Sequence, residues 1–162
     1  MTYAYIGLGS NSGHSQRHLR HAARLLQQLP GARLTAVSSL YCTAPQGCPG
    51  RQAFYYNAAV ELQTTQAPQR LFKSLRRLEK KIQKKPRAKN TARRLDADYL
   101  IHGHAKIRNA TLRLPHPLMH KRAFVLRPLS DVIGENSGNR PIKPQQLRLA
   151  LSACRDQKID KL

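Results

Sequence analysis

Acidic side chains are scarce in this protein. Its 162 residues include eight Asp and Glu against 29 Lys and Arg, and residues 1–60 contain no acid at all. The formal net charge is therefore +21 with the histidines neutral. A field of this sign attracts polyanions, such as nucleotides, nucleic acids and anionic membrane surfaces. The composition thus favours a partner that carries phosphate.

Other absences narrow the class of protein. Tryptophan is missing, and no apolar run approaches the ~20 residues that span a bilayer. Residues 1–6 lack the basic start and the long apolar core of a signal peptide, which predicts a cytoplasmic protein. The cysteines, Cys42, Cys48 and Cys154, have no CxxC spacing and predict reduced thiols in place of a zinc site. The length predicts a single domain, residues 1–162, and we expect a monomer that contacts no membrane.

Two of the few carboxylates follow the most basic segment. Residues 70–94 hold twelve Lys and Arg against the single acid Glu79, and the next residues include Asp96 and Asp98. In extended chain, residues i and i+2 point to the same face. Two like charges held together repel unless a cation lies between them, and Mg²⁺ shares its shell between one or two carboxylates, water and substrate phosphates. The pair therefore predicts a magnesium site for phosphate chemistry.

Four short segments have the pattern of β-strands. Residues 3–9 form an apolar run closed by glycines, and residues 34–43 alternate between their two faces in a sequence rich in β-formers. Residues 55–64 contain another such run, and the strand with the two Asp residues comes last.

Two amphipathic helices separate these strands. Apolar side chains recur at helical spacing in residues 19–29, which end at Pro30-Gly31, and in residues 71–82, for which Pro68 suits the first turn. The resulting order is that of a split βαβ plan. We therefore predict an α+β fold with a ferredoxin-like split βαβ core (βαββαβ). The segments expected after this core are an extra C-terminal hairpin and helices, at residues 102–114, 123–129 and 144–154.

The glycines near the N-terminus do not complete a nucleotide-binding loop. Gly7 and Gly9 resemble the start of GxGxxG, but Ser12 stands where the third glycine is required, and the sequence contains no Gly-x4-Gly-Lys-Ser/Thr. We interpret the two glycines as positions where the strand passes close to another backbone, with Ser10 or Asn11 capping the turn.

Six short blocks, in the expected order and spacing, resemble one enzyme family. The blocks are residues 5–11, 38–45, 56–62, 93–98, 114–117 and 122–129. The family is 6-hydroxymethyl-7,8-dihydropterin pyrophosphokinase, of folate biosynthesis. The fourth block resembles the family's Arg-x-Leu-Asp-Leu-Asp, so it contains the carboxylate pair.

The resemblance implies a fold and a reaction. The fold is ferredoxin-like, and the reaction transfers the β,γ-pyrophosphate of ATP to the hydroxymethyl group of a reduced pterin, which leaves AMP. By the same resemblance, Asp96 and Asp98 hold two Mg²⁺ ions that bridge the ATP phosphates and the attacking hydroxyl. Positioning and charge neutralisation supply most of the catalysis in such a transfer.

The resemblance also assigns the other site residues. Arg93 is catalytic together with the two carboxylates. The expected ligands of the triphosphate are Lys84, Lys85, Arg87, Arg93, His116 and Arg122. The expected pterin pocket consists of Thr43, Pro45, Tyr55, Asn57 and Phe124. From the residues alone, Phe124 and Tyr55 are also explained as core or strand residues, whereas a buried Asn57 requires hydrogen-bond partners.

The loop before the carboxylates departs from the family. Asn90-Thr91-Ala92 stand where Trp-Gly-Pro is usual, and Ala44 and Gln46 replace a proline and an apolar pocket residue. Three functions stay open: a pterin pyrophosphokinase, a paralogue with weak activity or altered acceptor specificity, and a basic nucleic-acid-binding module on the same fold. We favour the first, because residues 73–94 lack the aromatic side chains that many nucleic-acid-binding surfaces combine with basic ones.

Overall fold

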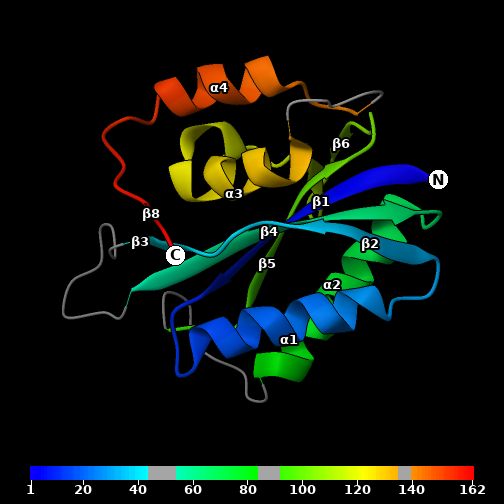
Figure 1. The fold of residues 1–162 in the computed structure, drawn as a ribbon. Coiled ribbons are helices and arrows are strands. Elements are labelled where there is room, and N and C mark those ends of the chain that lie inside the picture. The colour runs from blue at the N-terminus through cyan, green and yellow to red at the C-terminus, as the bar shows by residue number, and fades with distance from the viewer. Residues whose placement is uncertain (44–53, 84–91, 135–139) are drawn as a thin grey trace.

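An antiparallel sheet lies at the centre of the protein, as Figure 1 shows. The structure, a computed structural model, describes residues 1–43, 54–83, 92–134 and 140–162. The central strand β1 (Thr2–Ser10) pairs with β4 (Tyr55–Thr64) on one side and with β5 (Asp96–His102) on the other. Segments that are distant in the sequence therefore lie side by side at the middle of the sheet.

The far side of β4 carries two short strands where one was predicted. β2 (Ala32–Val37) and β3 (Tyr41–Thr43) both pair with β4, so the strand expected over residues 34–43 is interrupted. The interruption begins at Ser38, whose Oγ accepts a hydrogen bond from the backbone N–H of Ala59 at 2.8 Å. A side chain thus replaces a backbone carbonyl in the ladder. A further strand, β8 (Asp160–Lys161), which the sequence did not predict, pairs with β3.

Two amphipathic helices cover one face of the sheet. α1 (Ser15–Gln27) and α2 (Pro68–Gln83) contact each other below the sheet in Figure 1. The apolar stripe predicted for α2 is buried throughout, at Leu71, Leu75, Leu78 and Ile82. It packs with buried residues of α1 and with alternate residues of β1. The helices and strands together confirm the predicted ferredoxin-like core.

The C-terminal part of the chain covers the opposite face. α3 (Ala123–Ile133) packs on the sheet, and α4 (Pro144–Ser152) packs on α3. α3 continues through Pro128 beyond its predicted end at residue 129 and stops at Gly134, whose φ of 62° favours glycine. The short helix η1 (Met119–Lys121) precedes α3, and the predicted hairpin consists of β6 (Ile107–Arg108) and β7 (Arg113–Leu114). No helix within the described ranges is long and apolar enough to cross a membrane.

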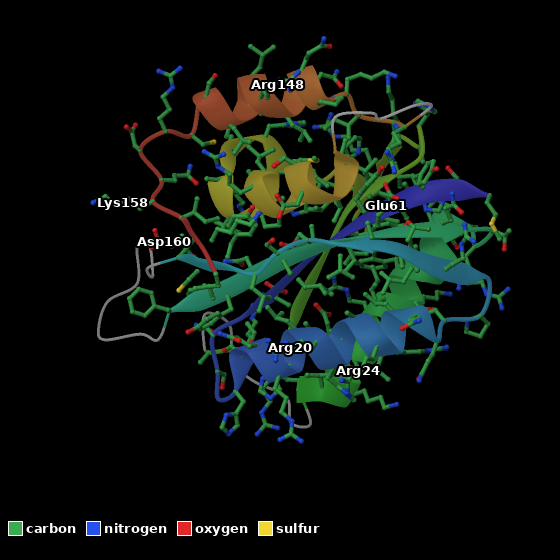
Figure 2. All side chains as sticks on the ribbon, viewed as in Figure 1. Arg20, Arg24, Glu61, Arg148, Lys158 and Asp160 are labelled. Carbon is green, nitrogen blue, oxygen red and sulfur yellow. The ribbon has the colours of Figure 1, made fainter. Side chains whose placement is uncertain are left out.

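A buried carboxylate ties this C-terminal layer to the sheet. The side chain of Glu61, labelled in Figure 2, is 2% exposed. It accepts hydrogen bonds from the Tyr5 hydroxyl at 2.9 Å, the Thr35 hydroxyl at 2.8 Å and Nε of Arg140 at 2.9 Å. Arg140 also donates to the backbone carbonyl of Ile133 at 3.2 Å. Three strands and the end of α3 therefore meet at one ion pair.

Replacing Glu61 with alanine should destabilise the fold strongly. The change leaves the guanidinium of Arg140 and the hydroxyl of Tyr5 without their buried acceptor, which costs about 3 kcal/mol. Urea unfolding at neutral pH measures this loss. The matched control is Lys161→Ala, because Lys161 pairs with Asp131 at 3.7 Å with 59% of its side chain exposed. The control should lose less than about 1 kcal/mol, and an equal loss in the two variants would contradict the assignment.

Candidate active site

A pocket of about 440 Å³ opens where β1, β4 and β5 meet the start of α3. Its lining residues are Gly7, Leu8, Gly9, Ser10, Asn11, Thr43, Tyr55, Asn57, Ala58, Arg93, Asp96, Asp98, Arg122, Phe124 and Val125. The predicted site residues among them are Thr43, Tyr55, Asn57, Arg93, Asp96, Asp98, Arg122 and Phe124. The fold thus brings carboxylates, guanidinium groups and aromatic rings into one cavity from four separate parts of the chain.

The two carboxylates enter the pocket because β5 is extended. Asp96 and Asp98 point to one side of the strand, and Ala97 between them is buried in the core beneath α2. Their cross-strand partners on β1 are Gly9 and Gly7. A methyl group on Gly7 would lie 3.7 Å from Cβ of Asp98, and one on Gly9 would lie 3.4 Å from Oδ1 of Asn57. The space over the glycines therefore belongs to the pocket, and our interpretation that they make room for another backbone is wrong.

Of the two carboxylates, Asp98 is the one without an ion pair among the described residues. Asp96 forms an ion pair with Nη1 of Arg93 at 3.2 Å, whereas Asp98 has no ion-pair partner within the described part of the chain. Burial and the charge of Asp96 raise the pKa of Asp98, although His116, Arg122 and Arg76 lower it. No group of three or more His, Cys, Asp or Glu side chains in the described ranges could enclose a metal ion. The pair fits Mg²⁺, which takes one or two carboxylates and completes its shell with water and phosphate.

Two side chains of α2 hold the backbone between the carboxylates. Oε1 of Glu79 accepts a hydrogen bond from the N–H of Ala97 at 2.7 Å, and Nη2 of Arg76 donates to the carbonyl of Ala97 at 2.7 Å. Arg76 and Glu79 pair with each other at 2.6 Å. Burial raises the pKa of Glu79 to about 7. The sequence showed only a basic helix with one acid, and the i, i+3 spacing of this pair was the signal that we missed.

The turn after β1 fixes the start of β5. The side-chain Oδ1 of Asn11 accepts a hydrogen bond from the N–H of Arg93 at 2.7 Å, and the N–H of Asn11 donates to the Arg93 carbonyl at 3.0 Å. Ser10 Oγ also donates to that carbonyl, at 3.4 Å. Our interpretation that Ser10 or Asn11 caps the turn is wrong, because Oγ of Ser10 and Oδ1 of Asn11 both bond to the backbone of Arg93. Instead, Ser10 and Asn11 hold the backbone of a predicted catalytic residue.

The pocket also contains an amide and aromatic rings. Asn57 is buried, and its Nδ2 donates to Oγ1 of Thr43 at 3.4 Å, so the predicted partner exists. The Arg122 guanidinium lies over the ring of Phe124, 5.6 Å from its centroid. Phe124 is half-buried and lines the cavity, and Tyr55 lines it as well. These residues offer one hydrogen-bonding edge and ring surfaces to a planar ligand.

His116 lies close enough to Asp98 for their charges to interact, but it is not a lining residue. Burial lowers its pKa, while the carboxylate of Asp98 raises it. Its Nδ1 accepts a hydrogen bond from the N–H of Leu118 at 3.3 Å. The predicted residues Pro45, Lys84, Lys85 and Arg87 lie outside the described residues, as do Asn90 and Thr91. Residues that the sequence did not assign to the site are Gly7, Leu8, Gly9, Ser10, Asn11, Ala58 and Val125.

Solved structures of HPPK-DHPS share this fold. The crystal structure of HPPK-DHPS in complex with substrates matches with a TM-score of 0.68, over 94% of this chain and 43% of that chain, at 12% identity. Plasmodium falciparum HPPK-DHPS with pteroate matches with a TM-score of 0.63, over 93% of this chain and 42% of that one, at 15% identity. The chain thus spans less than half the length of these proteins, and the likeness establishes the fold.

Sequence comparison establishes the family. The model of the 7,8-dihydro-6-hydroxymethylpterin-pyrophosphokinase family matches residues 5–134. The 2-amino-4-hydroxy-6-hydroxymethyldihydropteridine pyrophosphokinase of Bacillus subtilis is 37% identical over 129 residues, which are 80% of this chain and 77% of the relative. The protein of the same name from Pseudomonas aeruginosa is 33% identical over 158 residues, 98% of this chain and 95% of the relative. The chain belongs to the 7,8-dihydro-6-hydroxymethylpterin-pyrophosphokinase family.

Proposed function

We propose that this protein transfers pyrophosphate from ATP to 6-hydroxymethyl-7,8-dihydropterin and releases AMP, as a step of folate biosynthesis. The observation that carries the proposal is the pocket itself. Asp96, Asp98 and two guanidinium groups line it together with Asn57 and Phe124. A triphosphate and a planar heterocycle require these two environments side by side. We also propose that residues 1–162 form one domain, since both hydrophobic cores share the same sheet.

The carboxylates are the proposed metal ligands. Asp96 and Asp98 would hold two Mg²⁺ ions, which neutralise phosphate charge and lower the barrier to attack by the pterin hydroxyl. Asp98 supports this role, because its charge is buried beside Asp96 and lacks an ion-pair partner among the described residues. The hydrogen bonds from Arg76 and Glu79 to the backbone of Ala97 keep both carboxylates on the same side of β5.

The basic residues of the pocket are the proposed triphosphate ligands. Arg93 lies beside Asp96, and Arg122 lies at the start of α3, so their guanidinium groups approach the carboxylates from two sides. Charge-assisted hydrogen bonds from arginine to phosphate are strong and directional. His116, whose charge interacts with that of Asp98, is assigned the same role. We assign the same role to Lys84, Lys85 and Arg87 on the family resemblance alone.

The amide and the rings of the pocket form the proposed pterin site. Asn57 can pair with the edge of the heterocycle, since its amide is fixed by Thr43. Phe124 and Tyr55 offer ring surfaces for stacking, and the Arg122 contact orients the Phe124 ring. Pro45 is assigned to this site by resemblance. Ser10 and Asn11 position the neighbouring Arg93 and take no part in the chemistry.

A direct assay tests the proposal. Purified protein is incubated with MgATP and 6-hydroxymethyl-7,8-dihydropterin, and AMP and the pterin pyrophosphate are separated by chromatography. We expect AMP only when the pterin is present, in equal amount to the new pterin product. Absence of AMP across pH and divalent metals, or release of ADP in its place, would contradict the assigned reaction.

Replacing Asp98 with asparagine should abolish activity without harming the fold. The variant loses a metal ligand, so kcat should fall by at least about 100-fold. The raised pKa of Asp98 means that its ionised form is disfavoured in the metal-free fold, so the neutral isostere should melt at the same or a higher temperature. The control is Asp156→Asn, an exposed carboxylate outside the pocket. Near-normal turnover in Asp98→Asn would overturn the metal assignment.

The hydrogen bond from Ala97 to Glu79 predicts that kcat falls more when Glu79 is replaced by alanine than by glutamine. Alanine removes the acceptor for the Ala97 N–H, and kcat should fall by about 10–100-fold, as for other residues that orient metal ligands. Glutamine keeps an oxygen acceptor and should retain most of the activity. Lys80→Ala, an exposed change on the same helix, is the control. Steady-state kinetics with a Mg²⁺ titration measure the effect, and equal losses in the alanine and glutamine variants would show that the hydrogen bond is unimportant.

A further inference from the structure

The outer side of the α1 and α2 layer carries two rows of exposed basic side chains. We call this surface the basic face and define it by Arg17, Arg20 and Arg24 of α1 and by Arg70, Lys73 and Arg77 of α2. All six are exposed. Each row has the spacing i, i+3, i+7, which keeps its members on one side of a helix. Figure 2 labels Arg20 and Arg24 on α1, whose buried side is formed by Ser15, Leu19, Ala22 and Leu26.

No acid compensates these charges within the described part of the layer. α1 contains no Asp or Glu. The acid of α2, Glu79, pairs with Arg76 at 2.6 Å and bonds the backbone of Ala97, so it turns toward β5. A solvated helix surface usually mixes both signs of charge. The positive charge of the basic face is therefore not neutralised by the described residues of the two helices.

The catalytic pocket does not account for this field. The carboxylates and Asn57 point to the α3 side of the sheet, whereas α1 and α2 cover the other side. None of the six residues lines the pocket. ATP in the pocket would thus be held by Arg93 and Arg122, and the basic face would stay free.

We propose that the basic face binds the phosphodiester backbone of double-stranded nucleic acid without reading its sequence. A duplex carries one negative charge per ~1.7 Å of its axis, so two rows of cations on neighbouring helices meet phosphates at several positions. The proposal is independent of the pyrophosphokinase reaction.

The composition of the face distinguishes a duplex from other anionic partners. The large apolar side chains exposed in the described chain lie outside α1 and α2. A protein partner generally requires an apolar core in the interface, and an interfacial helix inserts apolar residues into a membrane. Single strands bind largely by stacking on aromatic rings, and the exposed positions of these two helices carry no Phe, Tyr or Trp. Charge without apolar or aromatic contacts is what a duplex backbone requires.

The test compares three variants of equal net charge. One carries Arg17→Gln, Arg20→Gln and Arg24→Gln, and a second carries Arg70→Gln, Lys73→Gln and Arg77→Gln. The control removes three charges from the other side of the molecule, with Arg148→Gln, Arg155→Gln and Lys158→Gln; Arg148 and Lys158 appear on that side in Figure 2. Fluorescence anisotropy measures binding of a labelled 24-base-pair duplex of mixed sequence, as RNA and as DNA, between 50 and 200 mM salt. Melting temperature and AMP release are measured on the same samples.

We expect the wild type to bind either duplex, with affinity falling by about 1,000-fold over this range of salt. Each helix variant should bind at least about 50-fold more weakly at 100 mM salt, with a shallower salt dependence, because about three phosphate contacts are lost. The control should bind like the wild type, and AMP release should be unchanged in all three.

Several results would overturn the proposal. Equal weakening in the control would show that net charge alone is responsible. Tighter binding to the single strand of the same length, or to vesicles rich in anionic lipid, would assign the face to another partner. No duplex binding by a folded, active wild type would reject the proposal and leave the pyrophosphokinase function untouched.

Discussion

The two hydrogen bonds that α2 makes to Ala97 position both carboxylates of the pocket through a residue whose own side chain lies in the core. β5 is at the end of the strand order, so the backbone groups on its outer edge lack a neighbouring strand within the described sheet. Edge groups of this kind need other partners. Glu79 and Arg76 supply them and also neutralise each other. The outer edge of β5 is thus paired at Ala97, and the same contacts set the direction of Asp96 and Asp98.

The scarcity of acids makes each described carboxylate informative. Glu61 pairs with Arg140, Glu79 with Arg76, Asp96 with Arg93, and Asp131 with Lys161. Asp98 is half-buried and has no such partner in the described ranges. A charge removed from water without a partner is costly, and it persists where a ligand compensates it. This contrast, in a protein with an excess of cations, is stronger support for a metal ligand than the Asp-x-Asp spacing.

Local features of the structure followed from the sequence, and non-local ones did not. α2 begins at the predicted Pro68 and buries the predicted stripe, because helix periodicity is a property of neighbouring residues. The break at Ser38 could not be predicted, since it depends on a bond to Ala59, 21 positions away. The anchoring of Arg93 by Asn11 joins residues 82 positions apart. The family resemblance predicted eight of the fifteen lining residues. The residues that hold these side chains in place could be identified only from the three-dimensional structure, because their hydrogen bonds join distant segments.

Basic side chains lie on both faces of one sheet, and the two groups have different proposed roles. The proposed phosphate chemistry in the pocket needs a few guanidinium groups close to the carboxylates, and Arg93 and Arg122 line that pocket. The rows on α1 and α2 lie on the other side, where they repel one another and weaken the compact state. Repulsion of this kind is tolerated readily on long, exposed side chains, because water and salt screen it. It is removed when counterions or a polyanion cover the surface. The apolar stripes of α1 and α2 are already buried, and their exposed cations lie away from the pocket. These cations are therefore not required for the proposed reaction.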